Sequence, residues 1–397
     1  MPTRPLQTLI CFIAVLVLAL PDASAADAAE SPMSDLALLH ERAEQLVSAG
    51  RHDEAIALLT PVAEEGSAET WFYLAMAYMG AEINAELSAD TTPNMQRAIA
   101  WAERSLEQDY ALSANVLATI FSMGLGVDAD EQRARGYLER GDALGDPGAS
   151  LNLAVRLLAE EPENACRRLH KLSQQESLVQ SVAQYHFGVS LIETDCPQTE
   201  PATDPIALLR AAGEEGVDDA LVYSAELLEQ GRRVQQDTAA ALALYDIAAR
   251  RGHARALWRM GLAHVNGDRP RDPSRAITLF KQSVDAGASD GLVSLGVMHA
   301  TGDGIDKDVA AAVAYYEQAA ALGNAHAMRN LGMMFWHGMD VEKQPRSALL
   351  WIEKAAALGN REALQWRDGM RAAFDDEVLA DIDALLNVWL EHFVGAH

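Results

Sequence analysis

The chain has 397 residues, of which 49% are hydrophobic and 22% are charged, a composition that excludes a disordered, collagen-like or polytopic membrane protein. Lys and Arg number 31 against 58 Asp and Glu, a formal net charge of −27. This charge makes nucleic acids and anionic membrane surfaces poor partners, because a polyanion cannot neutralise their phosphates. Aromatic residues form only 6% of the chain, and the abundant Ala, Leu and Glu favour helices.

Residues 1–25 have the features of a secretory signal peptide. Arg4 precedes an apolar run from Leu9 to Leu20, and Ala23-Ser24-Ala25 supplies small residues for cleavage after Ala25. The alternative is a membrane anchor, which needs about 20 apolar residues, more than this run provides. We therefore expect an exported chain, periplasmic or secreted, without a stable membrane anchor after cleavage. Residues 26–33 are expected to form a short linker.

The remainder of the chain repeats itself. Glycines recur with separations of 36, 35, 36 and 36 residues, at Gly216, Gly252, Gly287, Gly323 and Gly359. Between them, apolar residues recur every three or four positions in two segments separated by a loop, the pattern of two amphipathic helices. We call the first helix of each pair helix A and the second helix B, and expect each closing glycine to adopt a left-handed C-cap. In Met260-Gly261 and Leu295-Gly296 a glycine follows the core residue of helix A, which predicts close approach of the partner helix.

The residues of one unit match a known repeat. The run from Leu295 through Gly302-Asp303-Gly304-Ile305, Asp308, Tyr315-Tyr316, Ala319-Ala320 and Gly323 resembles the Sel-one-like repeat, a relative of the tetratricopeptide repeat. The resemblance implies an all-α, right-handed α-solenoid, and it is clearest over residues 216–359. We expect about nine helix pairs over residues 34–359, the least regular lying around residues 160–162, where the glycine loop is lost.

Residues 360–397 break the repeat pattern. A long amphipathic stripe without repeat glycines is formed here by Phe374, Val378, Leu379, Ile382, Leu385, Leu386, Trp389, Leu390 and Phe393. Because the last unit of a solenoid cannot bury its outer face alone, we expect capping helices. The alternative is an exposed helix that awaits a partner.

Cys166 and Cys196 are the two cysteines left after signal cleavage. Cys166 lies near the start of a helix B and Cys196 just past the end of the following helix A, so antiparallel packing makes a disulfide feasible, with a contribution of about 3–4 kcal/mol. The alternatives are two free thiols, or a zinc set completed by His170 and His186, whose spacing matches no common zinc pattern. We expect a disulfide and no metal.

The resembled family includes cysteine-rich secreted members linked to penicillin binding and weak β-lactamase activity, which makes a cell-wall or β-lactam hydrolase the alternative function. Serine enzymes of that kind need Ser-x-x-Lys. The residues three before the lysines are Arg168, Thr278, Gly304, Asp340 and Trp351, so no serine is placed to react. We expect no catalytic residues and no cofactor.

The loop from Asp303 to Asp308 contains a cluster of carboxylates similar to a calcium site. It lacks the spacing and the closing Glu of an EF-hand. We interpret it as a repeat loop in which Asp308 caps helix B.

Surface recognition is the function that the pattern favours. By analogy with tetratricopeptide grooves, the helix A side chains expected on the inner curve are Arg255, Trp258, Leu262, Val293, Val297, His326, Arg329, Met333 and Trp336, with Phe72, Met76 and Met79 as an N-terminal counterpart. Such an apolar stripe suits a helix or an extended peptide, although the same side chains could simply pack neighbouring A helices. Exported members of the resembled family act as adaptors, so we expect a non-enzymatic scaffold that binds another protein or peptide on its concave face.

Overall fold

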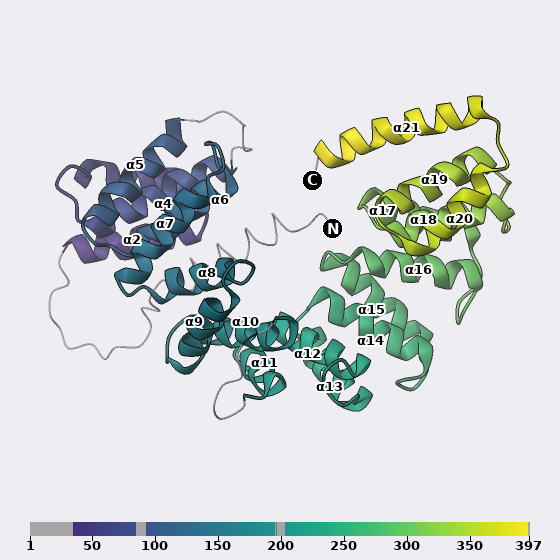
Figure 1. Ribbon diagram of the computed structural model, residues 1–397, viewed down its shortest axis with the longest axis horizontal. Helices are drawn as coiled ribbons and strands as arrows, with labels where there is room; N and C mark the ends of the chain where they lie inside the picture. Colours follow the sequence, from purple (N-terminus) through teal and green to yellow (C-terminus); the bar gives the residue numbers. More distant parts are fainter. Residues whose placement is uncertain (1–34, 85–92, 195, 197–202, 396–397) are drawn as a thin grey trace. The chain divides into compact units, whose positions relative to one another are not determined.

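The computed structural model describes residues 35–84, 93–194, 196 and 203–395. The expected signal peptide, residues 1–25, and the linker, residues 26–33, lie outside the described residues. Within the described part all regular structure is helical, and the chain divides between Val217 and Asp218 into two compact units (Figure 1). We call them the N-unit (up to Val217) and the C-unit (from Asp218).

The described helices form nine antiparallel pairs followed by two further helices, which confirms the expected all-α repeat. The N-unit contains α2 (Asp35–Ser48), α3 (His52–Leu59), the 3₁₀ turn η1 (Thr60–Val62), α4 (Ala68–Asn84), α5 (Pro93–Glu107), α6 (Ser113–Met123), α7 (Glu131–Ala143), α8 (Pro147–Leu157), α9 (Pro162–Gln174), α10 (Gln180–Glu193) and α11 (Pro205–Glu214). The C-unit contains α12 (Asp218–Gln230), α13 (Thr238–Arg250), α14 (Ala254–Asn266), α15 (Pro273–Asp285), α16 (Ser289–Thr301), α17 (Val309–Ala321), α18 (Ala325–His337), α19 (Pro345–Ala357), α20 (Arg361–Arg371) and α21 (Asp376–Gly395). Even-numbered helices from α2 to α18 are A helices, and their odd-numbered partners are B helices.

Local sequence determines where these helices begin and end. Several B helices follow an aspartate whose carboxylate accepts a hydrogen bond, at 2.9 Å, from the backbone N–H three residues later: Asp130, Asp237, Asp272 and Asp308. A helices end at glycines with φ between 65° and 94°, namely Gly124, Gly267, Gly302 and Gly338. Glycine is favoured there because a Cβ atom disfavours the left-handed conformation.

The two helices of a pair approach closely at the predicted glycines. A Cβ atom added at Gly261 would lie 2.5 Å from Cε1 of Phe280, and one at Gly296 would lie 2.5 Å from Cε1 of Tyr316. Both aromatic rings are buried on the partner B helix. Because each glycine has no side chain, the aromatic ring of helix B can pack directly against the backbone of helix A.

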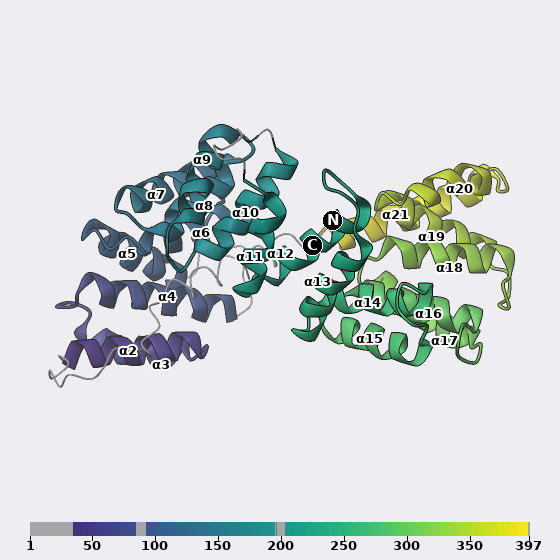
Figure 2. The same cartoon turned by 90° about the horizontal axis from the view of Figure 1, so that it is seen from below.

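Helices α20 and α21 cover the last pair. Val378 and Ile382 of α21 are buried in the same core as α18 and α19, and α21 lies beside α19 in Figure 2. Arg371 donates to Glu353 of α19 and to Asp383 of α21, at 2.6 and 2.8 Å, and these contacts raise the pKa of the guanidinium while lowering the pKa of Asp383. The expected C-terminal cap is therefore present. Helix α21 buries one face against the last pair and leaves most of its other side chains in contact with solvent.

Candidate functional site: the A-helix face

The predicted groove residues of the C-unit lie on α14, α16 and α18, the A helices of three consecutive pairs. We call the surface formed by Arg255, Trp258, Leu262, Val293, Val297, His326, Arg329, Met333 and Trp336 the A-helix face. The structure leaves all nine side chains at least partly exposed. Their environments nevertheless divide them into bridging residues and free apolar residues.

Three of the predicted residues form bridges from one A helix to a neighbouring helix: two of these bridges join A helices, and the third joins α18 to the capping helix α20. Arg255 Nε lies 2.6 Å from Glu226 Oε1 of α12, Trp258 Nε1 donates to Ser294 Oγ of α16 at 2.9 Å, and Arg329 Nη1 lies 3.0 Å from Glu362 Oε2 of α20. For Arg255 and Trp258 the alternative interpretation, packing between adjacent A helices, describes the contacts. Arg329 instead fastens α18 to the cap.

Further polar contacts of the same kind support this surface. His253, the N-cap of α14, lies 3.0 Å from Asp219 of α12, and this hydrogen bond lowers the pKa of the Asp219 carboxyl. Arg259 pairs with Glu229 of α12, and burial lowers the pKa of its guanidinium. The sequence placed His253 at a helix terminus as a packing or surface residue, but it gave no sign of the pairing between Arg259 and Glu229, which lie 30 positions apart on different A helices.

The apolar members of the A-helix face form a line. Leu262, Val297 and Met333 are separated by 35 and 36 residues and occupy one register position on successive A helices. Val297 is 42% exposed, and the other two are half-buried at the edges of separate core clusters. A line of apolar side chains at one register position is the feature of the C-unit surface best suited to hold a ligand segment.

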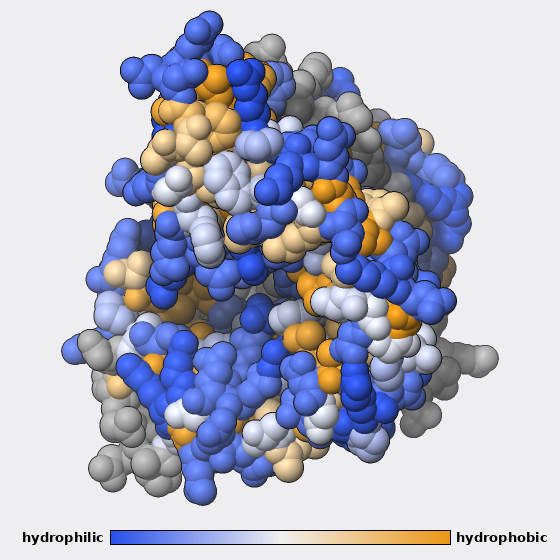
Figure 3. Space-filling model, turned by 90° about the vertical axis from the view of Figure 1, so that its right-hand side faces the viewer, coloured by the Kyte–Doolittle hydropathy of each residue, from blue (hydrophilic) through white to orange (hydrophobic). Residues whose placement is uncertain are grey.

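The remaining members lie at the margins of this line. Val293 and Trp336 are half-buried against the core of the last repeats, and the Trp336 ring meets Phe374 edge to face at 6.2 Å. His326 is exposed, with Nδ1 3.4 Å from Asn360 Nδ2. Figure 3 shows a mainly hydrophilic surface on which hydrophobic residues form small, interrupted patches.

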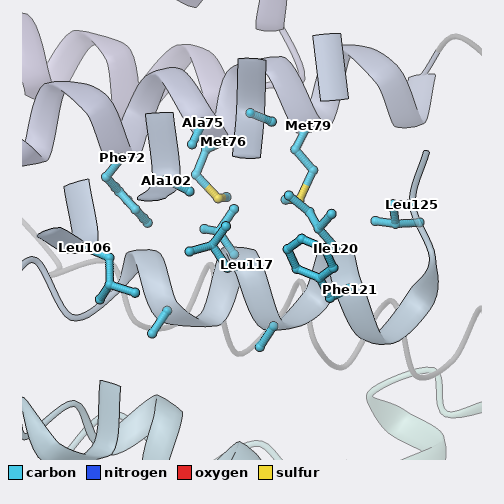
Figure 4. Close-up of a cluster of buried hydrophobic side chains, with 14 of the residues drawn as sticks. Phe72, Ala75, Met76, Met79, Ala102, Leu106, Leu117, Ile120, Phe121 and Leu125 are labelled. Carbon is cyan, nitrogen blue, oxygen red and sulfur yellow. The ribbon is translucent and has the colours of Figure 1, made fainter. Parts of the chain in front are cut away.

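The proposed N-terminal counterpart is wrong. Phe72, Met76 and Met79 of α4 are only 1%, 7% and 3% exposed, and they point toward α6, where they pack with Leu117 and Ile120 (Figure 4). Apolar spacing alone does not distinguish a groove from a buried seam, because both give the same periodicity. Helix α6 covers this face of α4 and turns the expected groove into core.

The helix pairs match the Sel1 repeat model at residues 74–110, 111–146, 218–253, 254–287, 289–324 and 325–360, more than half of the chain. The chain belongs to the Sel1 repeat family. Sel1 repeat proteins are helical scaffolds, in general non-enzymatic, that mediate protein–protein interactions. No match to this chain is found among curated proteins.

Two solved structures are similar to this Sel1 repeat chain. One is c5321, a protective antigen present in uropathogenic Escherichia coli strains, with a TM-score of 0.61 and 20% identity over 89% of this chain and 78% of that chain. The other is a Sel1 repeat protein from Oxalobacter formigenes, with a TM-score of 0.56 and 22% identity over 89% of this chain and 99% of that chain. At this identity the likeness shows the shared fold.

The two cysteines lie between the matched Sel1 repeats. Cys166 of α9 and Cys196, just after α10, are joined in a disulfide with a Cα–Cα distance of 5.8 Å. The bond uses both thiols that a zinc site with His170 and His186 would have needed. Within the described ranges no three His, Cys, Asp or Glu side chains gather as metal ligands.

In the fifth matched Sel1 repeat, the acidic loop from Asp303 to Asp308 is joined to neighbouring loops by two ion pairs. Asp303 pairs with Arg271, and Lys307 Nζ donates to Asp340 at 2.5 Å. Asp308 accepts from the backbone N–H of Ala311 and caps α17. Asp303 and Asp308 therefore have structural partners, as the interpretation of a repeat loop predicts.

A contact that resembles a hydrolase triad joins α2 to α4 ahead of the first matched Sel1 repeat. His40 Nδ1 lies 2.9 Å from Glu69 Oε2, and His40 Nε2 lies 2.8 Å from Thr70 Oγ1, the order of acid, base and hydroxyl used in nucleophilic catalysis. Thr70 exposes none of its surface and His40 only 6%. A substrate carbonyl cannot reach a buried hydroxyl, so this contact fastens the two helices. Sequence reasoning missed it because the residues are about 30 positions apart and match no motif.

Proposed function

We propose that this Sel1 repeat chain is an exported adaptor that holds a segment of another protein along the A-helix face of its C-unit. The observation that carries the proposal is the line of Leu262, Val297 and Met333, one residue on each of three successive A helices, of which α14 and α16 are joined by the hydrogen bond from Trp258 to Ser294. Adjacent helices pack about 8–10 Å apart, so three of them span roughly 20 Å. An extended segment of about six residues covers that length.

The chemistry of the surface defines the partner segment. Its apolar side chains would lie on the apolar line, since exposed apolar positions in register favour apolar contacts. Basic residues would flank them, because a net charge of −27 attracts a cationic partner during encounter. The bridging side chains would stay paired with one another, so they contribute rigidity more than direct affinity.

Export is supported by two features of the chain. Residues 1–25 carry the signal pattern, and a disulfide such as Cys166–Cys196 persists mainly in oxidising compartments. No described helix combines the length and the apolar character needed to cross a bilayer. Cell fractionation followed by N-terminal sequencing tests the proposal: we expect envelope or medium protein that begins at Ala26, and an intact Met1 would contradict it.

The binding proposal is tested by Val297→Asp, with Ile247→Asp as the matched control. Both side chains are apolar and similarly exposed, at 42% and 40%, but Ile247 lies on α13, a B helix. In photo-crosslinking from position 297 and position 247, we expect a discrete partner only from 297. Once that partner is purified, Val297→Asp should weaken its binding about tenfold or more in calorimetry, whereas Ile247→Asp should not. Equal binding by both variants would place the site elsewhere.

A further inference from the structure

A second surface feature of the C-unit lies among α13, α14 and α15. It is a pocket of about 300 Å³, a size that admits a small ligand. Its apolar wall is formed by Ala249, Leu257, Met260 and Leu279. None of the nine residues of the A-helix face lines it, so the pocket is distinct from the proposed adaptor surface.

The polar lining of this pocket is strongly basic. Three guanidinium groups line it, from Arg250, Arg269 and Arg275, against a single carboxylate, Asp246. Asp246 is already paired with Arg250 of the same helix. The lining therefore carries a net charge of about +2 within a chain of net charge −27.

Two of the three guanidinium groups have no carboxylate paired with them in the part of the chain that the structure describes. Arg269 Nε is buried and has no hydrogen-bond partner among the described residues, a state that is unfavourable for a charged donor. Arg275 forms no ion pair with any residue that the structure describes, although its backbone N–H donates to Asp272. His264 is held at the same pocket by a 3.0 Å contact of its Nδ1 with the carbonyl oxygen of Pro270.

A larger pocket between two B helices of the N-unit, with a volume of about 820 Å³, serves as an internal reference. It lies between α5 and α7 and is lined by two acids and two bases, Glu103, Glu107, Arg133 and Arg140. Arg133 lies 2.9 Å from Glu103, and Arg140 pairs with Asp109. The protein therefore neutralises its own cations in that pocket, so the excess positive charge of the C-unit pocket is not a general result of stacking B helices.

We propose that the C-unit pocket binds a small anionic molecule, in which a phosphate or carboxylate group is joined to an apolar body no larger than a single ring. Guanidinium groups recognise such anions through paired N–H donors, and Arg269 and Arg275 supply them. The apolar wall takes the body of the ligand, as in most small-molecule sites.

Calorimetric titration of the full chain tests this site with phenyl phosphate, benzoate, inorganic phosphate and neutral benzyl alcohol. We expect phenyl phosphate or benzoate to bind at least about tenfold more tightly than inorganic phosphate, and benzyl alcohol not to bind. Arg269→Gln and Arg275→Gln should each weaken binding about tenfold. Arg275 is exposed, so its variant remains informative if Arg269→Gln does not fold.

Arg133→Gln in the charge-balanced N-unit pocket is the matched control and should leave binding unchanged. An equal loss with Arg133→Gln would reveal non-specific attraction and overturn the proposal. The proposal would also be overturned if neither phenyl phosphate nor benzoate bound at a concentration of about 10 mM, at which even a very weak complex forms. Equal affinity for inorganic phosphate and phenyl phosphate would overturn the role of the apolar wall.

Discussion

At the scale of single residues, Gly296 shows how the repeat depends on a missing side chain. A Cβ atom there would lie 2.5 Å from Cε1 of Tyr316, so we expect Gly296→Ala to destabilise the C-unit by about 1–3 kcal/mol in urea unfolding. Gly369→Ala is the matched control, because nothing lies within 4 Å of that position in α20. It should be neutral or stabilising by about 0.5–1 kcal/mol, and a similar loss in both variants would contradict the packing argument.

His186 of α10 should make the stability of the N-unit depend on pH. Burial lowers the pKa of its imidazole to about 4, whereas an unfolded histidine titrates near pH 6.5. As the pH falls from about 6.5 to 4 the unfolded chain binds a proton that the folded chain does not, so stability decreases. The free energy of unfolding of the parent should fall when the pH is lowered from 7 to 4.5. In His186→Gln this fall should be smaller, by on the order of 2 kcal/mol. Identical pH profiles in urea unfolding would contradict this assignment.

At the scale of helices, the disulfide joins the least regular pairs of the N-unit. It closes a loop across 30 positions, which restricts the unfolded chain by about 3–4 kcal/mol. We expect Cys166→Ser to speed amide hydrogen exchange in α9 and α10, and exchange in α16 to α19 to stay unchanged. Uniform acceleration throughout the chain would show that the disulfide acts on more than these pairs.

The N-cap residue of α17, Asp308, also contributes to the stability of the C-unit. Asp308 accepts a 2.9 Å hydrogen bond from the backbone of Ala311, so Asp308→Ala should destabilise the C-unit by about 1 kcal/mol in urea unfolding. Asp306→Ala, an exposed residue in the same loop, is the control and should have little effect. Stabilisation of the parent by added Ca²⁺, lost in both variants, would instead support the calcium interpretation of this loop.

At the scale of the whole molecule, each Sel1 repeat depends mainly on its neighbours. Leu331 of α18 is fully buried in the last core cluster, and Leu331→Ala should destabilise that core by about 2–5 kcal/mol. Because solenoid repeats contact only adjacent repeats, hydrogen exchange should rise in α16 to α20 and remain unchanged in α4 to α7. Equal acceleration in α4 to α7 would show that the two units unfold together.

Sequence alone determined the repeat and its architecture. The 35- and 36-residue spacing, the capping aspartates and the glycines after the core residues act through local backbone preferences and through contacts within one helix pair. Such signals depend on few residues at short separation, which is why the helix pairs and the closing glycines could be assigned in advance. The C-terminal cap followed from the same logic, since the last pair needs a cover.

Only the tertiary structure decided which side chains are available to a ligand. Phe72 and Val297 both belong to apolar stripes on A helices, yet Phe72 is buried by α6 and Val297 is exposed. The bridge from Trp258 to Ser294 and the pocket around Arg269 likewise combine residues from different helices or loops. Periodicity specifies which side of a helix a residue occupies, but exposure and charge balance depend on what the neighbouring helices place against that side.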